Sequence, residues 1–399
     1  MKARRAIILC FNARPTPRQQ NLFQLFKEMG WRPAYVTWDR SGVADQGDTQ
    51  VGESFLEVIR LAAPTESPKL LFVMPKYWHR IKLVLNQLMC TEDTPPVIVA
   101  THFFHLRFAR IFKKAIWLYD ASEYFAFDLS RYFGFCANIV RPALFYLEGL
   151  GVRRMRAVLA VDSRGGWFEK HLRRFCSSVR VVPNVPALAD DPPPELARLV
   201  ANEYAGRRVV CYVGGIMERK GLQVALDAID VIRRDIPDVL LLLIGPYRGN
   251  SEKLDELLCM RKLKNHVKII NQLPYSDMLV KISSAEIGLA LHQQDPLYER
   301  VGALNGRKMF TYMQAGLAIV GPKLGDIGQV VQEIGCGVLV DAQKPADIAT
   351  SVCTLLSNWK LRNQMKLNSR RAFEQQYNWE MVMQELKPWL LECCSHLRV

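Results

Sequence analysis

The sequence lacks any apolar run long enough to cross a bilayer, since a spanning helix needs about 20 mostly apolar residues in succession. Its first residues, MKARRAIILCF, place basic side chains before apolar ones. This apolar stretch is too short for a signal peptide and has no cleavage site. We therefore interpret residues 5–11 as a β-strand and expect a cytoplasmic protein.

Motifs for metal, redox and acyl chemistry are also missing. The ten cysteines are scattered and none stands in a Cys-x-x-Cys pair, which favours free thiols over disulfides or zinc. No Asp-x-Asp pair is present to clamp a metal-bound diphosphate, and no Gly-x-Ser-x-Gly motif occurs. The two histidines of HFFH, His102 and His105, have no evident further ligands. We therefore expect neither a metal nor another cofactor.

Acidic residues are scarce in the first half of the chain. Residues 1–183 hold 27 Lys+Arg and 15 Asp+Glu, a surplus of +12, whereas residues 184–399 hold 26 and 24, a surplus of +2. A basic surface can meet nucleic acid, anionic lipid or a phosphorylated substrate, but no nucleic-acid-binding motif accompanies this charge. We expect no nucleic acid and propose peripheral contact with the inner face of an anionic membrane. The alternative is a surface that only aids solubility.

The run FFHLRFARIFKK, residues 103–114, mixes aromatic and cationic side chains at helical spacing. Such a helix could lie on a membrane surface. A packed amphipathic helix explains the pattern equally well.

Short β-rich runs alternate with helical segments along the whole chain, which is typical of α/β domains with parallel sheets. The candidate strands are the apolar runs 5–11, 33–38, 97–101, 115–120, 157–162, 179–184, 208–214, 238–245, 267–270, 286–291, 317–321 and 337–341. A proline-rich linker at 183–196 predicts two doubly wound domains, 1–183 and 184–377, facing across a cleft. Ligands of such sheets bind beyond the carboxyl ends of the strands, so two facing domains favour group transfer.

The stretch YVGGIMERKG combines a strand, two glycines and a helix start. Gly214 and Gly215 let backbone N–H groups approach an anion, while Lys220 and the positive end of the helix dipole add charge. A plain strand-to-helix turn explains the same residues equally well.

A second helix start lies in NGRKMFTYMQAG, which begins at Asn305 and ends at Gly316. Asn305 is expected to cap the helix, and Gly316 to end it in the left-handed conformation. The helical wheel places Lys308, Thr311 and Tyr312 on the side opposite the apolar residues, where a ligand would lie. Two helix starts that each carry a lysine favour a diphosphate site.

Two further positions complete the candidate donor site. Gly245 ends the strand run LLLLIG and leaves a second opening at a strand end. Leu273 belongs to the loop INQLPYSDML, against whose backbone a flat base could lie.

Several segments together resemble one family, glycosyltransferase family 4, which has the GT-B fold. ATHFFH is similar to the family's His-x-His-Asp strand end, and LYDASEYF to a Tyr-Asp-x-His-Glu segment. YVGGIMERKG, LLLIGP and KMFTYMQAGLAIVGPKLGDIGQVVQEIGCGVLVD resemble the donor domain. YNWEMVMQEL resembles the terminal helix, here 378–399, which in such proteins packs back on the first domain. The resemblance covers nearly the whole chain.

Three positions depart from the family pattern. Gly215 stands where an arginine usually pairs with the diphosphate, and Thr311 where a glutamate accepts hydrogen bonds from the donor ribose. Ser122 stands where a histidine is expected near the transferred sugar. Lys220 matches the family lysine.

The resemblance implies a glycosyltransferase that moves a sugar from a nucleotide-diphosphate donor to a glycan or to a polyprenyl- or lipid-linked acceptor, without metal. Ser122, Glu123 and His102 would then face the sugar. The residues assigned to the donor are Gly214, Gly215, Lys220 and Lys308 for the diphosphate, and Thr311, Gly245 and Leu273 for the ribose and base. We expect a role in surface polysaccharide or glycolipid biosynthesis.

A rival hypothesis is a GT-B pseudoenzyme that holds a partner transferase or a glycan. The three departures favour this rival, whereas Lys220, Lys308 and the two helix starts favour the enzyme. A nucleotide-sugar epimerase with the same fold has no local support in the sequence.

Overall fold

The structure is a computed structural model that describes most of the 399 residues. The described ranges are 3–40, 50–51, 54–63, 70–90, 92, 94–162, 165–189, 191–217, 221–247, 249–293 and 306–395. The chain divides into two compact units, one formed by Met1–Asn184 with Val382–Val399 and the other by Val185–Met381. The limits 183 and 377 for independently folding domains stay predictions.

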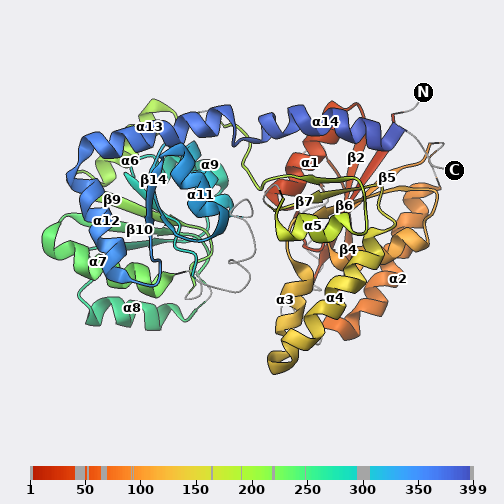
Figure 1. Ribbon diagram of the computed structural model, residues 1–399, viewed down its shortest axis with the longest axis horizontal. Coiled ribbons are helices and arrows are strands. Elements are labelled where there is room, and N and C mark those ends of the chain that lie inside the picture. Colours follow the sequence, from red (N-terminus) through yellow and green to blue (C-terminus); the bar gives the residue numbers. More distant parts are fainter. Residues whose placement is uncertain are drawn as a thin grey trace. The chain divides into compact units, whose positions relative to one another are not determined.

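The first unit is built on one sheet with the strand order β3-β4-β2-β1-β5-β6-β7-β8 (Figure 1). Its strands are β1 Arg5–Leu9, β2 Arg32–Asp39, β3 Gln50–Val51, β4 Ser54–Arg60, β5 Val97–Ala100, β6 Ile116–Ala121, β7 Ala157–Ala160 and β8 Val179–Val181. All pair in parallel except β3, which pairs antiparallel with β4. In the register at its centre, Ile7 lies between Ala34 and Ile98.

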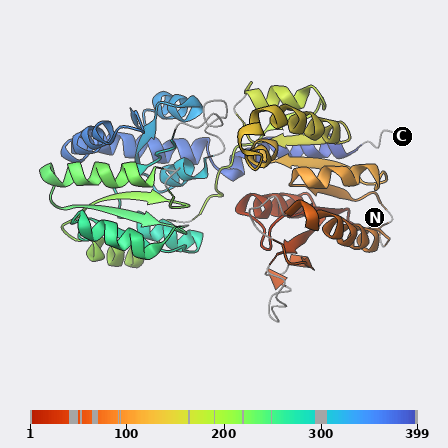
Figure 2. The ribbon, with the colours of Figure 1, turned by 90° about the horizontal axis from the view of Figure 1, so that it is seen from below.

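Helices cover both faces of this sheet, as Figure 2 shows. They are α1 Pro17–Glu28, α2 Leu70–Met89, α3 Phe125–Arg131, α4 Ala137–Val152 and α5 Trp167–Arg173, with the 3₁₀ helices η1 Phe103–Arg110 and η2 Gly134–Cys136. The central strands are apolar throughout because both of their faces are buried.

The second unit has a six-stranded, all-parallel sheet with the order β11-β10-β9-β12-β13-β14. The strands are β9 Arg208–Val213, β10 Val239–Ile244, β11 Val267–Ile270, β12 Ile287–Leu289, β13 Ala318–Pro322 and β14 Gly337–Val340. The helices are α6 Pro194–Glu203, α7 Leu222–Asp235, α8 Ser251–Met260, α9 Tyr275–Ile282, α10 Arg307–Gln314, α11 Gly325–Ile334, α12 Pro345–Ser357 and α13 Trp359–Gln375.

The last helix, α14 Trp379–Ser395, begins in the second unit and continues into the first. Two arginines of the first unit donate hydrogen bonds to carbonyl oxygens of its final turn, Arg4 to Cys394 at 2.8 Å and Arg156 to Cys393 at 2.6 Å. In the part of the chain that the structure describes, no helix is long and apolar enough to cross a membrane.

The predicted α/β class with two doubly wound parallel sheets is confirmed. Residues 103–110 form a 3₁₀ helix whose Phe108 is buried, which favours the packed helix over the membrane-surface helix for this run. Helix α10 has Gly306 at its N-cap position, and Asn305, the expected cap, lies outside the described residues. Gly316 does end the helix with a left-handed φ of 64°.

Candidate nucleotide-sugar site

Two glycines close the carboxyl ends of neighbouring strands in the second unit. Gly214 follows β9 with φ +100°, and Gly245 follows β10 with φ +145°. The Gly214 N–H donates to the Ile244 carbonyl at 2.9 Å. A Cβ added to Gly245 would lie 2.2 Å from the carbonyl oxygen of Gly214. Both positions therefore need glycine, for backbone conformation and, at Gly245, for space.

Lys308 of helix α10 reaches this edge of the sheet. Its Nζ lies 3.6 Å from the centre of the Tyr212 ring, at cation–π distance. Its Cε lies 3.9 Å from the position of a Cβ on Gly214. The Tyr212 hydroxyl donates to the Gly215 carbonyl at 3.4 Å. The structure thus brings three predicted diphosphate residues together, while Lys220 lies outside the described residues.

Tyr312 anchors helix α10 against the sheet. Its buried hydroxyl accepts a hydrogen bond from the Val213 N–H at 3.0 Å and donates one to the Leu289 carbonyl at 2.9 Å. Burial holds the pKa of Tyr312 well above its ordinary value, so the hydroxyl keeps its proton. The close fit requires Gly288 on β12, where a Cβ would lie 2.4 Å from the Tyr312 ring.

Helix α10 does not have the open second side that the helical wheel predicts. Every residue from Met309 to Gln314 is buried, because the helix packs on both β13 and α13. Thr311 is only 2% exposed, and its hydroxyl donates to the Arg307 carbonyl at 3.2 Å. The expectation that Tyr312 faces a ligand is therefore wrong, and Thr311 contacts other residues of its own domain.

In the first unit, His102 follows strand β5 and is the N-cap of η1. Its ring stacks on Phe11 with 3.8 Å between ring centres, and its Nδ1 accepts the N–H of Phe104 at 3.2 Å. Burial holds the pKa of His102 well below its ordinary value, so the imidazole is neutral at physiological pH. With 9% of its surface exposed, it is a covered acceptor rather than an open base.

Ser122 and Glu123 directly follow strand β6. Ser122 is half-buried and Glu123 is exposed. The preceding Asp120 is buried in an ion pair with Arg18, whose Nε lies 2.8 Å from the Asp120 Oδ1. Arg18 also donates to the Val182 carbonyl at 2.9 Å. This pair joins α1, β6 and the end of β8, so it fixes the backbone that presents Ser122 and Glu123.

Known proteins resemble this chain in sequence and in fold. Residues 196–372 match the family model described as "Glycosyl transferases group 1". The second unit therefore resembles this family, and the whole chain has the GT-B fold. Spore coat protein SA of Bacillus subtilis is 27% identical over 188 residues, 45% of this chain and 48% of the relative. A phosphatidyl-myo-inositol mannosyltransferase of Mycobacterium leprae is 26% identical over 181 residues, 45% of each. The chain spans about half the length of the curated relatives it matches.

Solved structures resemble the chain over nearly its whole length. Sucrose-phosphate synthase from Thermosynechococcus elongatus has a TM-score of 0.73 at 18% identity, covering 98% of this chain and 100% of the other. Anabaena HepE in complex with UDP has a TM-score of 0.72 at 14% identity, covering 97% and 100%. At these identities the similarity establishes the fold.

Sequence reasoning missed a polar cluster beside Thr311 in the second unit. The Tyr275 hydroxyl lies 3.4 Å from the Thr311 hydroxyl and donates to Gln314 Oε1 at 2.6 Å. The Arg307 guanidinium lies 4.8 Å from the centre of the Tyr275 ring, and burial lowers its pKa. Leu273 is half-buried, two residues before Tyr275. Arg307 directly precedes Lys308 in the sequence, and this position could have indicated that Arg307 lies near the site.

No metal site accompanies this arrangement in the described part of the chain, where no group of three or more His, Cys, Asp or Glu residues could hold an ion. His105 is fully buried, and its Nε2 lies 2.8 Å from the Tyr77 hydroxyl. Burial lowers the pKa of His105 to about 3. His105 is therefore a structural residue of the first unit.

Proposed function

We propose that this protein transfers a sugar from a nucleotide-diphosphate donor to a glycan or lipid-linked acceptor. The observation that carries the proposal is Lys308, which is held over Tyr212 beside the glycine at the end of β9, within the region that matches the glycosyl transferase family. Structural neighbours support the donor class, because Anabaena HepE was solved with UDP and with UDP and glucose.

In this proposal the cations act on the leaving group. Lys308 and Lys220 neutralise the diphosphate as its bond to the sugar breaks, which lowers the barrier because the charge develops in the transition state. Gly214 and Gly215 let backbone groups approach the phosphates, and Gly245 and Leu273 border the ribose and base. In a reaction that retains the anomeric configuration, a departing phosphate oxygen can accept the proton of the acceptor hydroxyl. No enzymic base is then required at Ser122.

Around the sugar, Ser122 and Glu123 offer hydrogen-bonding groups, and neutral His102 supports the backbone beside them. Thr311 borders the ribose through its cluster with Tyr275, since Thr311 itself is buried. These roles need neither a metal nor another cofactor.

We also propose a cytoplasmic location with peripheral contact to an anionic membrane and a role in surface polysaccharide or glycolipid biosynthesis. The surplus of +12 in residues 1–183 supports this contact. So do two exposed apolar residues, Phe135 in η2, which is 97% exposed, and Ile139 in the first turn of α4, which is 78% exposed. Arg131 and Arg141 lie close to these residues in the sequence, which suits an anionic surface.

A screen of nucleotide sugars and nucleoside diphosphates for thermal stabilisation tests the donor assignment. A ligand at 100 times its dissociation constant should add about 2.7 kcal/mol to the folded state. A donor that stabilises the protein should then release its nucleoside diphosphate when acceptor is added. Stabilisation without release under all acceptor conditions would favour the binding-protein rival, which the changed residues Gly215, Thr311 and Ser122 suggest.

A further inference from the structure

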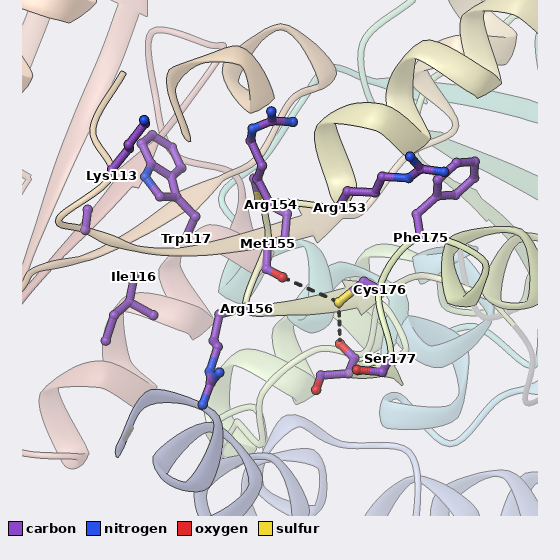
Figure 3. A pocket seen from close by; sticks show the side chains of 12 residues that line it. Lys113, Ile116, Trp117, Arg153, Arg154, Met155, Arg156, Phe175, Cys176 and Ser177 are labelled. Atoms are coloured by element: carbon purple, nitrogen blue, oxygen red, sulfur yellow. Dashed lines mark hydrogen bonds between the residues drawn. The ribbon is translucent and has the colours of Figure 1, made fainter. Parts of the chain in front are cut away.

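A hollow of about 450 Å³ lies at the amino ends of strands β6, β7 and β8 in the first unit (Figure 3). Three connections that lead into these strands line it, namely residues 113 and 115–117, residues 153–156 and residues 175–178. Backbone hydrogen bonds join the connections, from the Arg156 N–H to the Trp117 carbonyl at 2.6 Å and from the Val158 N–H to the Ser178 carbonyl at 2.8 Å.

This hollow is separate from the proposed sugar-transfer residues. Ser122 and Glu123 follow the carboxyl end of β6, whereas Lys113 precedes its amino end. Six strand residues separate the two ends, a span of about 20 Å. A ligand in the hollow therefore serves a purpose other than holding the reacting sugar.

The lining is strongly basic. It contains four cations, Lys113, Arg153, Arg154 and Arg156, and none of the described lining residues is acidic. None of the four forms an ion pair within the described residues. Nearby Arg173, by contrast, pairs with Glu169 at 2.7 Å. Like charges that gather without a carboxylate repel each other, and a bound anion relieves that repulsion.

Helix capping explains part of this charge. Arg156 donates to the Cys393 carbonyl at 2.6 Å in the last turn of α14, and so has a structural task. Arg154 donates to the Leu150 carbonyl near the end of α4, but at 3.4 Å this bond is long. Cations near helix C-termini are ordinary stabilising features. This explanation leaves Lys113 unaccounted for, since it follows no α-helix.

Figure 3 shows how the side chains are directed. Lys113 and Arg154 extend toward the same side of the view, while Arg156 turns the opposite way. Arg153 lies over the Phe175 ring, 5.5 Å from its centre. Lys113 forms no hydrogen bond or ion pair in the described part of the chain. Lys113 and Arg154 are therefore the two lining cations that share a direction and have the weakest contacts of their own.

We propose that this hollow binds a phosphate group, carried by a lipid headgroup or by a soluble phosphorylated molecule. An arginine fork and a lysine ammonium together suit a multiply charged oxyanion, because the fork donates paired hydrogen bonds and the ammonium adds a point charge. A volume of about 450 Å³ also lies within the range of ordinary ligand pockets, so it accommodates the group to which the phosphate is attached.

The test uses the full chain and two phosphate probes at constant ionic strength. Calorimetric titration with glycerol 3-phosphate reports soluble binding, and flotation with phosphatidylcholine vesicles, with or without phosphatidic acid, reports lipid binding. The double substitution Lys113→Gln/Arg154→Gln removes the proposed contacts. The matched control Arg110→Gln/Lys114→Gln removes the same charge from exposed neighbours that do not line the hollow.

We expect the variant Lys113→Gln/Arg154→Gln to bind at least one probe about tenfold more weakly than wild type. The affinity of the control variant should change by about twofold or less. Weaker binding of glycerol 3-phosphate by this variant identifies a soluble ligand. Weaker binding of the phosphatidic acid vesicles alone identifies a lipid. Equal binding by the two variants, or binding of neither probe by the wild-type protein, overturns the proposal. Melting temperatures and nucleotide affinity should be the same in both variants, because the sugar-transfer residues are untouched.

Discussion

Replacing Glu148 by Gln should remove a pH dependence from the stability of the first unit. Glu148 lies on α4 with 0% of its surface exposed, and its Oε1 accepts a hydrogen bond from the Tyr119 hydroxyl at 2.6 Å. Its Oε2 has no hydrogen-bond partner among the described residues. Burial raises the pKa of Glu148 from 4.5 to about 7, although the bond from Tyr119 opposes the shift.

The direction of this pH dependence follows because the folded protein binds the Glu148 proton more tightly than the unfolded chain does. The folded protein keeps this proton up to about pH 7, whereas the unfolded chain loses it near pH 4.5. The contribution of Glu148 to the free energy of unfolding is therefore at its full value below about pH 4.5 and is lost as the pH rises through 7. The two pKa values differ by about 2.5 pH units, which corresponds to about 3 kcal/mol. For a domain of this size, that amounts to about 6–12 °C in melting temperature.

The assay is scanning calorimetry of wild type and Glu148→Gln between about pH 5 and 8.5. The introduced amide keeps an oxygen that can accept from Tyr119, and it cannot ionise. The melting temperature of the first unit should therefore fall by about 6–12 °C more in wild type than in the variant over this range. Glu28→Gln, an exposed change on α1, serves as the control and should follow wild type. Parallel pH profiles for wild type and Glu148→Gln would refute a proton held by burial at this site.

Other substitutions probe the second unit and the membrane contact. Lys308→Met should weaken nucleoside diphosphate binding about tenfold by calorimetric titration, while exposed Lys344→Met should leave it unchanged; equal affinities would remove Lys308 from the donor site. Gly245→Ala should lower the melting temperature and abolish nucleotide binding, because its Cβ would meet backbone at 2.2 Å, and normal values for both would contradict that close approach. Thr311→Glu should lower the melting temperature, because it places a carboxylate in a site only 2% exposed; an unchanged melting temperature with tighter nucleotide binding would show a ribose pocket instead. Phe135→Ser should reduce co-sedimentation with anionic vesicles, and unchanged binding would remove η2 from the proposed membrane contact.

The strands could be located from sequence because their apolar runs are buried on both faces and bounded by glycine or polar residues. β6 and β10, for example, follow their candidate runs to within a residue or two. β4 was missed, since SFLEVIR is less apolar and its only neighbours in the sheet are β2 and the short β3. The run 103–114 shows another limit. Its spacing predicts an amphipathic helix, but periodicity cannot distinguish a 3₁₀ helix from an α-helix when burial decides the packing.

Some features of the candidate site could also be predicted from sequence, and others could not. Gly214, Gly245 and Lys308 could be brought together from sequence, because parallel strands end at one edge of a sheet and the following helices start there. The burial of Thr311 could not, since a helical wheel shows only one helix, whereas α13 covers α10 from residues about 60 positions further along the chain. The bond between Tyr275 and Gln314 likewise depends on the packing of α9 against α10.

Helix α14 has a consequence for how the protein is made. The first unit includes Val382–Val399, so its last contributing segment leaves the ribosome after the entire second unit. Until then, the arginines that bond to the carbonyls of Cys393 and Cys394 lack these partners. The second unit can fold while the first is still incomplete, although the first began synthesis earlier. A chimera that exchanges the first unit between related proteins must therefore carry this C-terminal segment with it.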